Sequence, residues 1–289
     1  MPVAVVTDTT QYMPPEVIAR HGLHVVSLYV NWDGGTERES AVESYAGFYD
    51  RLCSATTMPT TSQPSVGDFL AVYEPLLESR HDIVSIHLSS GMSGTVGVAA
   101  AAREQLVEQG LEPGRIVIID SQTACAGIGL MAIAAANAAR RGVGVEKAAE
   151  RAAALRRDLK VWFVLDTMEF LRRGGRIGAA SAWVGSTLRI KPILRLEAQI
   201  EPVERVRTWS RAFERLLGHL EQRHVEGHDL WVIQHARADE QVARLIDRGV
   251  EIFGREPEFI SELGAVVGTH TGPGVLGVAA ISSELSGPI

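Results

Sequence analysis

The chain has 289 residues, 46% of them apolar, which is enough to bury one large core or two modest ones. Its formal net charge of −7 argues against a main role in binding nucleic acid or an anionic membrane surface. The two cysteines, Cys53 and Cys125, are far apart in sequence, so the chain predicts neither a disulfide framework nor a zinc site.

The amino-terminal residues carry no basic, apolar leader, and no later segment has about 18 uninterrupted apolar residues. We therefore expect a cytoplasmic protein that does not insert stably into a membrane. Short β-branched runs alternate with longer helical patterns through the first half of the chain, which is typical of a parallel sheet with helices on both faces. The predicted strands span residues 3–6, 25–30, 83–88 and 115–119, and the predicted helices span residues 14–21, 40–54, 66–79, 95–109, 124–140 and 146–157.

The pattern changes near residue 157, where we place a boundary between two α/β domains, residues 1–157 and 158–289. The second domain has predicted strands at residues 161–165, 190–196, 230–234, 258–263 and 277–281, and predicted helices at residues 166–173, 180–187, 210–223 and 238–253. Between Arg156 and Arg215 there are 13 Lys and Arg against 7 Asp and Glu, a local basic excess in an acidic protein. This excess favours docking to an acidic or phosphate-bearing partner, although a solvated helix face is the alternative.

Three short polar tracts, residues 60–64, 89–95 and 268–272, interrupt the apolar pattern. They supply hydroxyls, closely approachable backbone amides and one imidazole, and a carboxylate or phosphate oxygen needs several such donors within about 3 Å. The second tract follows a predicted strand and leads into a predicted helix, where the helix dipole favours anions. Ser93 and Thr95 could equally do no more than cap that helix. Together the tracts predict an anion cradle.

His270 lies between two threonines in what we expect to be a Gly-rich loop. Isolated histidines are often structural, but the neighbouring hydroxyls favour an imidazole that faces the same anion as Thr61 and Ser93. A protonated or Nε2–H imidazole would donate a hydrogen bond to a carboxylate. Arg176 follows two glycines, which permit a close approach to a ligand or partner, and a solvated arginine on a turn is the alternative.

A serine-hydrolase interpretation remains an alternative. Ser93 stands on a predicted strand-to-helix turn, as an α/β-hydrolase nucleophile does, and His270 with an aspartate could complete a triad in three dimensions. The spacing does not match G-x-S-x-G, because residue 95 is Thr. The chain also has no G-x-x-x-x-G-K-[ST] sequence, so ATP would have to come on a partner.

The polar tracts belong to a series of six motifs that occur in the order of a known family. They are Val-Val-Thr-Asp-Thr-Thr at 5–10, Thr-Ser-Gln-Pro at 61–64, Ser-Ser-Gly-Met-Ser-Gly-Thr at 89–95, Asp-Ser at 120–121, Arg-Gly-Gly-Arg-Ile at 173–177 and Gly-Thr-His-Thr-Gly-Pro-Gly at 268–274. Across nearly its full length, the chain resembles the DegV family of bacterial fatty-acid-binding proteins, which includes the acyl-binding subunits of fatty acid kinase. It departs from the family pattern at Thr9, where Ser is common, and at residues 11–13, where Gln-Tyr-Met replaces small and acidic residues.

The resemblance implies a two-domain α/β protein that buries a long-chain fatty acid, such as palmitate or oleate, in an apolar tunnel and holds its carboxylate between the domains. It implies a lipid-binding carrier with no cofactor, metal or chemistry of its own. In the kinase system, the loaded subunit presents the carboxyl group to an ATP-dependent kinase partner, which forms the acyl phosphate for phospholipid metabolism. By motif position, the ligand-binding residues would be Thr61, Ser62, Ser93, Gly94, Thr95, Thr269 and His270. The partner-docking residues would be Arg176 and Arg207.

Burial of an acyl chain is favourable, because each methylene removed from water contributes roughly 0.8 kcal/mol. Apolar side chains along the tunnel would then set the preference for chain length and unsaturation. The candidates, for which ordinary core packing is the alternative, are Leu88, Met92, Ile128, Leu130, Met131, Phe163, Leu188 and Ile193. A lipid-sensing adaptor is a third possible function.

Overall fold

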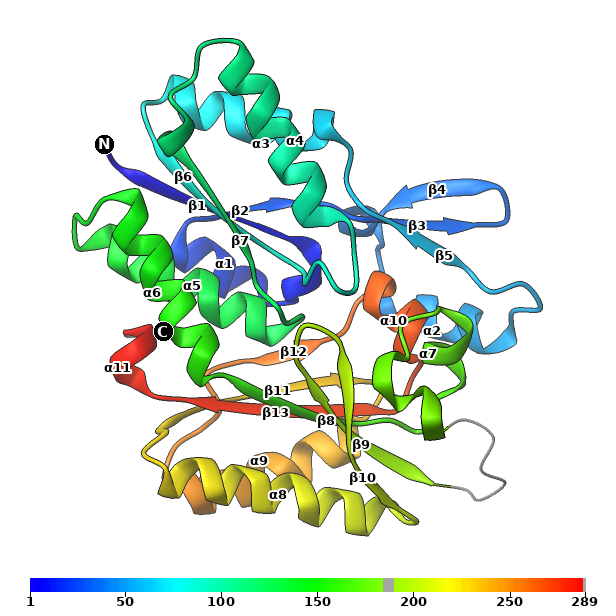
Figure 1. Ribbon diagram of the computed structural model, residues 1–289. Coiled ribbons are helices and arrows are strands. Elements are labelled where there is room, and N and C mark those ends of the chain that lie inside the picture. The colour runs from blue at the N-terminus through cyan, green and yellow to red at the C-terminus, as the bar shows by residue number, and fades with distance from the viewer. Residues whose placement is uncertain (184–189, 288–289) are drawn as a thin grey trace.

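The computed structural model describes residues 1–183 and 190–287, which fold into alternating layers of helix and sheet (Figure 1). The first large sheet is parallel and has four strands in the order β2-β1-β6-β7. Its strands are β1 (Val3–Asp8), β2 (Leu23–Val26), β6 (Asp82–His87) and β7 (Ile116–Asp120). Helices α3 (Val66–Glu78) and α4 (Thr95–Glu108) cover its outer face.

The second large sheet has six strands in the order β10-β9-β8-β13-β11-β12 and is antiparallel except for the β11–β12 pair. Its strands are β8 (Lys160–Val164), β9 (Lys191–Leu196), β10 (Ile200–Val206), β11 (Leu230–Ala236), β12 (Ile260–Glu262) and β13 (Val275–Ile281). Helices α8 (Trp209–Val225) and α9 (Asp239–Phe253) cover its outer face (Figure 1).

Helices α5 (Ala126–Arg140) and α6 (Val145–Asp158) lie between the two large sheets (Figure 1). Every residue of α5 from Ala126 to Asn137 is buried, and the helix contacts β1 and β6 on one side and β11 on the other. Its small side chains allow close packing: a Cβ on Gly129 would stand 2.8 Å from Met13 Cγ. One apolar core therefore runs from Val5 of β1 through α5 to Ile281 of β13.

A small antiparallel sheet in the order β4-β3-β5 extends to one side of these layers (Figure 1). It consists of β3 (Tyr29–Trp32), β4 (Gly35–Arg38) and β5 (Thr60–Ser62). Helix α10 (Ala265–Thr271) contacts β3, β5, α2 (Tyr45–Ser54) and α7 (Glu169–Arg173). The two remaining α-helices among the described residues are α1 (Pro15–His21) and α11 (Ser283–Ser286). Helix α10 thus joins the carboxyl-terminal half to elements of the first half.

The structure confirms the α/β class and the parallel sheet of the first half, and it corrects several elements. Residues 25–30 were expected to form one strand, but they divide between β2 and β3, which belong to different sheets. The expected loop around His270 is wrong, since residues 265–271 form helix α10. The helix expected at 180–187 overlaps a 3-10 turn over Gly178–Trp183, and residues 184–187 lie outside the described part. Strands β4, β5 and β10 had no sequence prediction.

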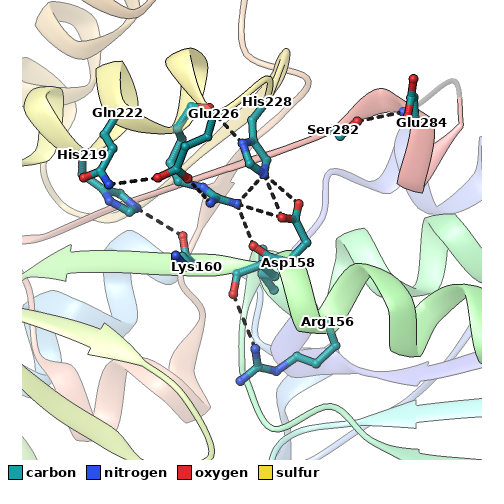
Figure 2. A network of polar contacts seen from close by, with 11 residues as sticks. Arg156, Asp158, Lys160, His219, Gln222, Glu226, His228, Ser282 and Glu284 are labelled. Atoms are coloured by element: carbon teal, nitrogen blue, oxygen red, sulfur yellow. Dashed lines mark hydrogen bonds and ion pairs between the residues drawn. The ribbon is translucent and has the colours of Figure 1, made fainter.

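The junction between α6 and β8, where the sequence predicts the domain boundary, is held by a polar cluster in which Arg223 and His228 are buried (Figure 2). His228 Nε2 lies 2.9 and 2.8 Å from the two carboxylate oxygens of Asp158, and His228 Nδ1 donates to the Arg223 carbonyl at 2.8 Å. The Arg223 guanidinium donates to the Asp158 carbonyl at 2.6 Å and to Glu226 at 2.5 Å. The cluster fixes the end of α6 against the end of α8.

No helix within residues 1–183 and 190–287 combines the length and the apolar character that crossing a bilayer would demand.

Candidate functional site

A cavity of about 410 Å³ opens where β5, α10 and the tract after β6 approach the second large sheet. Its volume falls in the range of about 300–1,000 Å³ that is typical of small-molecule sites. Apolar side chains from both halves of the chain form much of its wall, among them Leu88, Phe163, Leu196, Ile200 and Val275. Polar residues from all three tracts also line it, so the fold brings the three tracts together around one space.

The link between the first and third tracts is a hydrogen bond between Thr61 and His270. Thr61 lies on β5 and His270 lies on α10, and Thr61 Oγ1 stands 2.8 Å from His270 Nε2 although 209 residues separate them. Strand β5 is held by antiparallel pairing with β3, which places Thr61 opposite Val30. The pair therefore depends on the small sheet and on α10 together.

The imidazole of His270 is neutral near pH 7, because burial and the nearby Arg176 lower its pKa to about 4. Its Nδ1 is buried and has no hydrogen-bond partner among the described residues. A buried N–H without an acceptor is rare, so we assign the proton to Nε2, which then donates to Thr61 Oγ1. The Thr61 hydroxyl hydrogen remains available to donate to a ligand oxygen.

The second tract contributes Ser93 and Gly94 to the cavity wall. The hydroxyls of Ser93 and Thr95 lie 2.9 Å apart, and Thr95 N donates to Ser93 Oγ at 3.4 Å. A Cβ on Gly94 would stand 2.8 Å from Gln63 Cδ, so the glycine lets the first and second tracts pack together. Gln63 also lines the cavity.

The other predicted site residues occupy different positions. Ser62 lines the cavity, whereas Thr95 is fully buried and is not part of the wall. The Thr269 hydroxyl donates to the Ala265 carbonyl at 2.8 Å inside α10, and it is Thr271 that lines the cavity.

The two predicted docking arginines differ in their relation to the cavity. Arg176 lines it and is exposed, and its guanidinium donates to the carbonyls of Gly174 at 2.8 Å and Met92 at 3.3 Å. Arg207 is exposed on the segment between β10 and α8 and is not one of the wall residues. Gly174 packs directly on His270, because a Cβ there would overlap the imidazole.

Residues that the sequence analysis missed hold α10 in place. Glu39, which is 1% exposed, accepts hydrogen bonds at Oε1 from the Tyr12 hydroxyl at 2.6 Å and from Val266 N at 2.7 Å. The Tyr12 hydroxyl accepts from Val267 N at 3.1 Å. These two amides belong to the first turn of α10, and its N-cap residue, Gly264, makes no side-chain cap of its own. A carboxylate from the first half of the chain thus caps the helix that carries His270.

A second contact between the halves closes the side of the cavity near the second tract. The turn between β9 and β10 reaches this tract, where Ser89 Oγ donates to the Ala198 carbonyl at 2.7 Å. Gly91 approaches the same carbonyl too closely to permit a Cβ. Leu196 and Ile200, on either side of this turn, therefore reach the cavity wall.

The predicted tunnel residues divide into two groups. Leu88, Met92 and Phe163 line the cavity. Ile128, Leu130 and Met131 of α5 and Ile193 of β9 are fully buried core residues that are not part of the wall. Leu188 lies outside the described residues.

Ser93 and His270 do not form a hydrolase triad, and the described residues contain no metal-binding cluster. Ser85, His87 and Asp8 are linked in a triad-like chain, with Ser85 Oγ 2.6 Å from His87 Nε2 and His87 Nδ1 3.1 Å from Asp8 Oδ2, but all three side chains are fully buried and none lines the cavity. The Ser93 hydroxyl pairs with Thr95, His270 Nε2 pairs with Thr61, and no carboxylate in residues 1–183 and 190–287 bonds to His270. Cys125 lines the cavity, but burial raises the pKa of its thiol, which keeps it protonated. No group of three His, Cys, Asp or Glu in the same described part could hold a metal ion.

Comparisons with known proteins agree over nearly the whole chain. A family model described as an uncharacterised protein of the DegV family matches residues 2–283. Protein DegV of Bacillus subtilis is 34% identical over 281 residues, which cover 96% of this chain and 98% of the relative. A solved structure described as fatty acid binding of a DegV family protein from Thermus thermophilus has a TM-score of 0.88 at 35% identity and covers 98% of this chain and 100% of its own. The crystal structure of DegV from Bacillus subtilis, described as a fatty acid binding protein, has a TM-score of 0.87 at 34% identity, with 98% and 100% of the two chains covered.

Proposed function

This chain belongs to the DegV family, and we propose that it binds one long-chain fatty acid with the acyl chain in the cavity and the carboxylate at Thr61, Ser93 and His270. The fatty acid binding of its structural relatives from Thermus thermophilus and Bacillus subtilis supports the proposal. The protein then acts as a carrier that holds a lipid without transforming it.

The observation that carries the proposal is the Thr61–His270 pair in the wall of a largely apolar cavity. Because His270 Nε2–H donates to Thr61 Oγ1, the hydroxyl hydrogen of Thr61 is free to be donated elsewhere. A carboxylate oxygen, which only accepts hydrogen bonds, suits this donor. The neutral imidazole adds no net charge, so the donors orient the head group while the buried methylenes, at roughly 0.8 kcal/mol each, supply most of the affinity.

The first test is native mass spectrometry of the purified protein, followed by organic extraction and identification of the lipid. We expect one fatty acid per chain. Thr61→Val and His270→Ala should each weaken palmitate binding, whereas Thr36→Val, which changes an exposed threonine of β4, should not. A protein that is empty and that takes up neither palmitate nor oleate would refute the proposal.

We further propose that the loaded protein presents its carboxyl group to an ATP-dependent fatty acid kinase partner, which forms the acyl phosphate. Two features support this role: Arg176 is exposed at the cavity wall, and Arg207 is exposed on a segment of the chain that is rich in basic residues. Because the partner uses ATP, the proposal also assigns the protein to the cytoplasm.

This second step is tested by adding a purified fatty acid kinase subunit and ATP to the palmitate-loaded protein. Acyl phosphate formation should fall in Arg207→Ala while palmitate binding stays constant, because Arg207 is not part of the cavity wall. Arg244→Ala, which removes an arginine stacked on Phe213 elsewhere, is the matched control. Equal rates in all three proteins would exclude Arg207 from docking.

The alternative of a hydrolase that uses Ser93 and His270 receives no support from the described geometry. Ser93 is bonded to Thr95 rather than to His270, and the partner of His270 is a threonine hydroxyl. A serine nucleophile needs a base within hydrogen-bond reach. An assay with acyl esters should therefore show no turnover that depends on Ser93.

A further inference from the structure

One residue of the cavity wall does not suit a plain hydrocarbon chain. Gln234, on β11, lines the cavity among apolar neighbours and is only 3% exposed. Burial of a carboxamide costs free energy unless its donors and acceptor are hydrogen-bonded. Both the oxygen and the nitrogen of this carboxamide therefore need a hydrogen-bond partner.

Among the described residues, the oxygen of the carboxamide has a hydrogen-bond partner and the nitrogen has none. Gln234 Oε1 accepts from Ala126 N, the first amide of α5, at 3.3 Å. This bond fixes the orientation of the group, because an amide N–H can donate only to the oxygen. Nε2 donates to no residue in the part of the chain that the structure describes.

The fold makes room for this side chain. Gln234 stands opposite Gly277 in the β11–β13 pair, and Phe163 stands opposite Gly277 on the other side in β8. A Cβ on Gly277 would lie 2.9 Å from Gln234 Cγ and 3.2 Å from Nε2. The glycine thus leaves space in the middle of the sheet for the carboxamide to lie beside Phe163, which is itself a wall residue.

We propose that Gln234 Nε2 donates a hydrogen bond to an oxygen on the acyl chain, so that the cavity prefers a fatty acid with a hydroxyl or keto group along its chain over the unsubstituted acid. This inference rests on the proposed function, since it concerns the same cavity. The carboxylate keeps its place at Thr61 and His270, and Gln234 adds a second polar contact in the acyl-binding part of the wall. A ligand oxygen there satisfies a donor for which the described residues supply no acceptor.

The test compares stearate with series of hydroxystearates and oxostearates that carry the oxygen at successive chain positions. Dissociation constants are measured by isothermal titration calorimetry for the wild type and for Gln234→Met, which keeps the length of the side chain and removes the donor. We expect at least one oxygenated isomer to bind the wild type about five- to tenfold more tightly than stearate does, the worth of one hydrogen bond. Gln234→Met should lose this preference.

Phe163→Leu serves as the control, because it reshapes the same part of the wall without changing a hydrogen-bonding group. It should alter the affinities for both ligands and keep the wild-type preference for the oxygenated isomer. If Gln234→Met does not fold, the side-chain amide signal of Gln234 in the wild type replaces it. That signal should shift between the stearate complex and the complex with the preferred isomer.

The outcomes separate this inference from the proposed function. If stearate binds but no oxygenated isomer is preferred, or if Gln234→Met keeps the preference, the role of Gln234 is refuted and fatty acid binding stands. If neither stearate nor any isomer binds, the proposed function itself fails.

Discussion

Removal of the Glu39 carboxylate should destabilise α10 and, with it, the proposed head-group site. In Glu39→Ala, the Tyr12 hydroxyl and Val266 N both lose their acceptor inside the core. A buried donor without a partner costs about 1–3 kcal/mol, so the free energy of unfolding should fall by about 2–6 kcal/mol. The displacement of α10 should break the Thr61–His270 bond and weaken palmitate binding at least about tenfold, the effect of about 1.4 kcal/mol.

Glu39→Gln is the matched control, because the amide keeps one oxygen that accepts from both donors. Glu39→Gln also tests how the ionisable carboxyl group of Glu39 affects the pH dependence of stability. Burial raises the pKa of Glu39 in the folded protein, so the native state holds this proton more tightly than the unfolded chain does. The resulting stability is present below the unfolded pKa and is lost as the pH rises through the folded pKa. Glu39→Gln should remove that part of the pH dependence and bind palmitate nearly as the wild type does.

The assays are urea unfolding followed by circular dichroism across a pH series, and calorimetric titration with palmitate. The reasoning is refuted if Glu39→Ala unfolds within about 0.5 kcal/mol of the wild type, the usual range for a surface substitution. It is also refuted if Glu39→Ala is destabilised as expected yet binds palmitate unchanged. That second result would show that the cap on α10 supports the fold without positioning His270.

Three further predictions concern single residues. The pKa of His270 is lowered to about 4 in the folded protein, so the unfolded chain binds the proton at a higher pH than the folded protein does. The free energy of unfolding should therefore decrease as the pH falls from about 6.5 to about 4. Urea unfolding of His270→Gln should show a smaller decrease over the same pH range. Gly174→Ala should weaken palmitate binding about as strongly as His270→Ala does, because the added Cβ would overlap the imidazole of His270. Gly97→Ala is the control, since a Cβ at this position of α4 meets no other atom; it should bind palmitate normally and raise the free energy of unfolding by about 0.5–1 kcal/mol. Asp158→Asn removes the charged partner of His228 and should lower the thermal midpoint with little change in palmitate affinity, and equal losses of both would contradict this separation.

The sequence carried enough information for the parallel sheet and for several polar residues that line the cavity. The spacing of apolar residues distinguishes buried strands from helices in a sequence, and the polar tracts stand next to such elements. Thr61, Ser93 and His270 could therefore be singled out from the sequence, and the structure places all three in the wall of one cavity. What local pattern could not give was the hydrogen bond between the first and the third of them.

Helix α10 shows why the rest could not be predicted. Its sequence contains Gly268, Thr269 and Thr271, which have low intrinsic helix propensity, so a loop was the better local interpretation. The helix exists because Glu39 and Tyr12 cap it from more than 200 residues away along the chain. Strand β10 was missed for a related reason: it is a polar edge strand with a register shift between Pro202 and Glu204.

Helix α5 has a consequence for any attempt to divide this protein. Its residues from Ala126 to Asn137 are buried on all sides because each large sheet covers part of the helix. A fragment that ends near residue 157 would keep α5 but expose the apolar face that β11 normally covers, and the complementary fragment would expose the inner face of its own sheet. Both pieces would then be prone to aggregate, so a protease cut between them should release no stable half, and heat should unfold the intact chain in one cooperative transition.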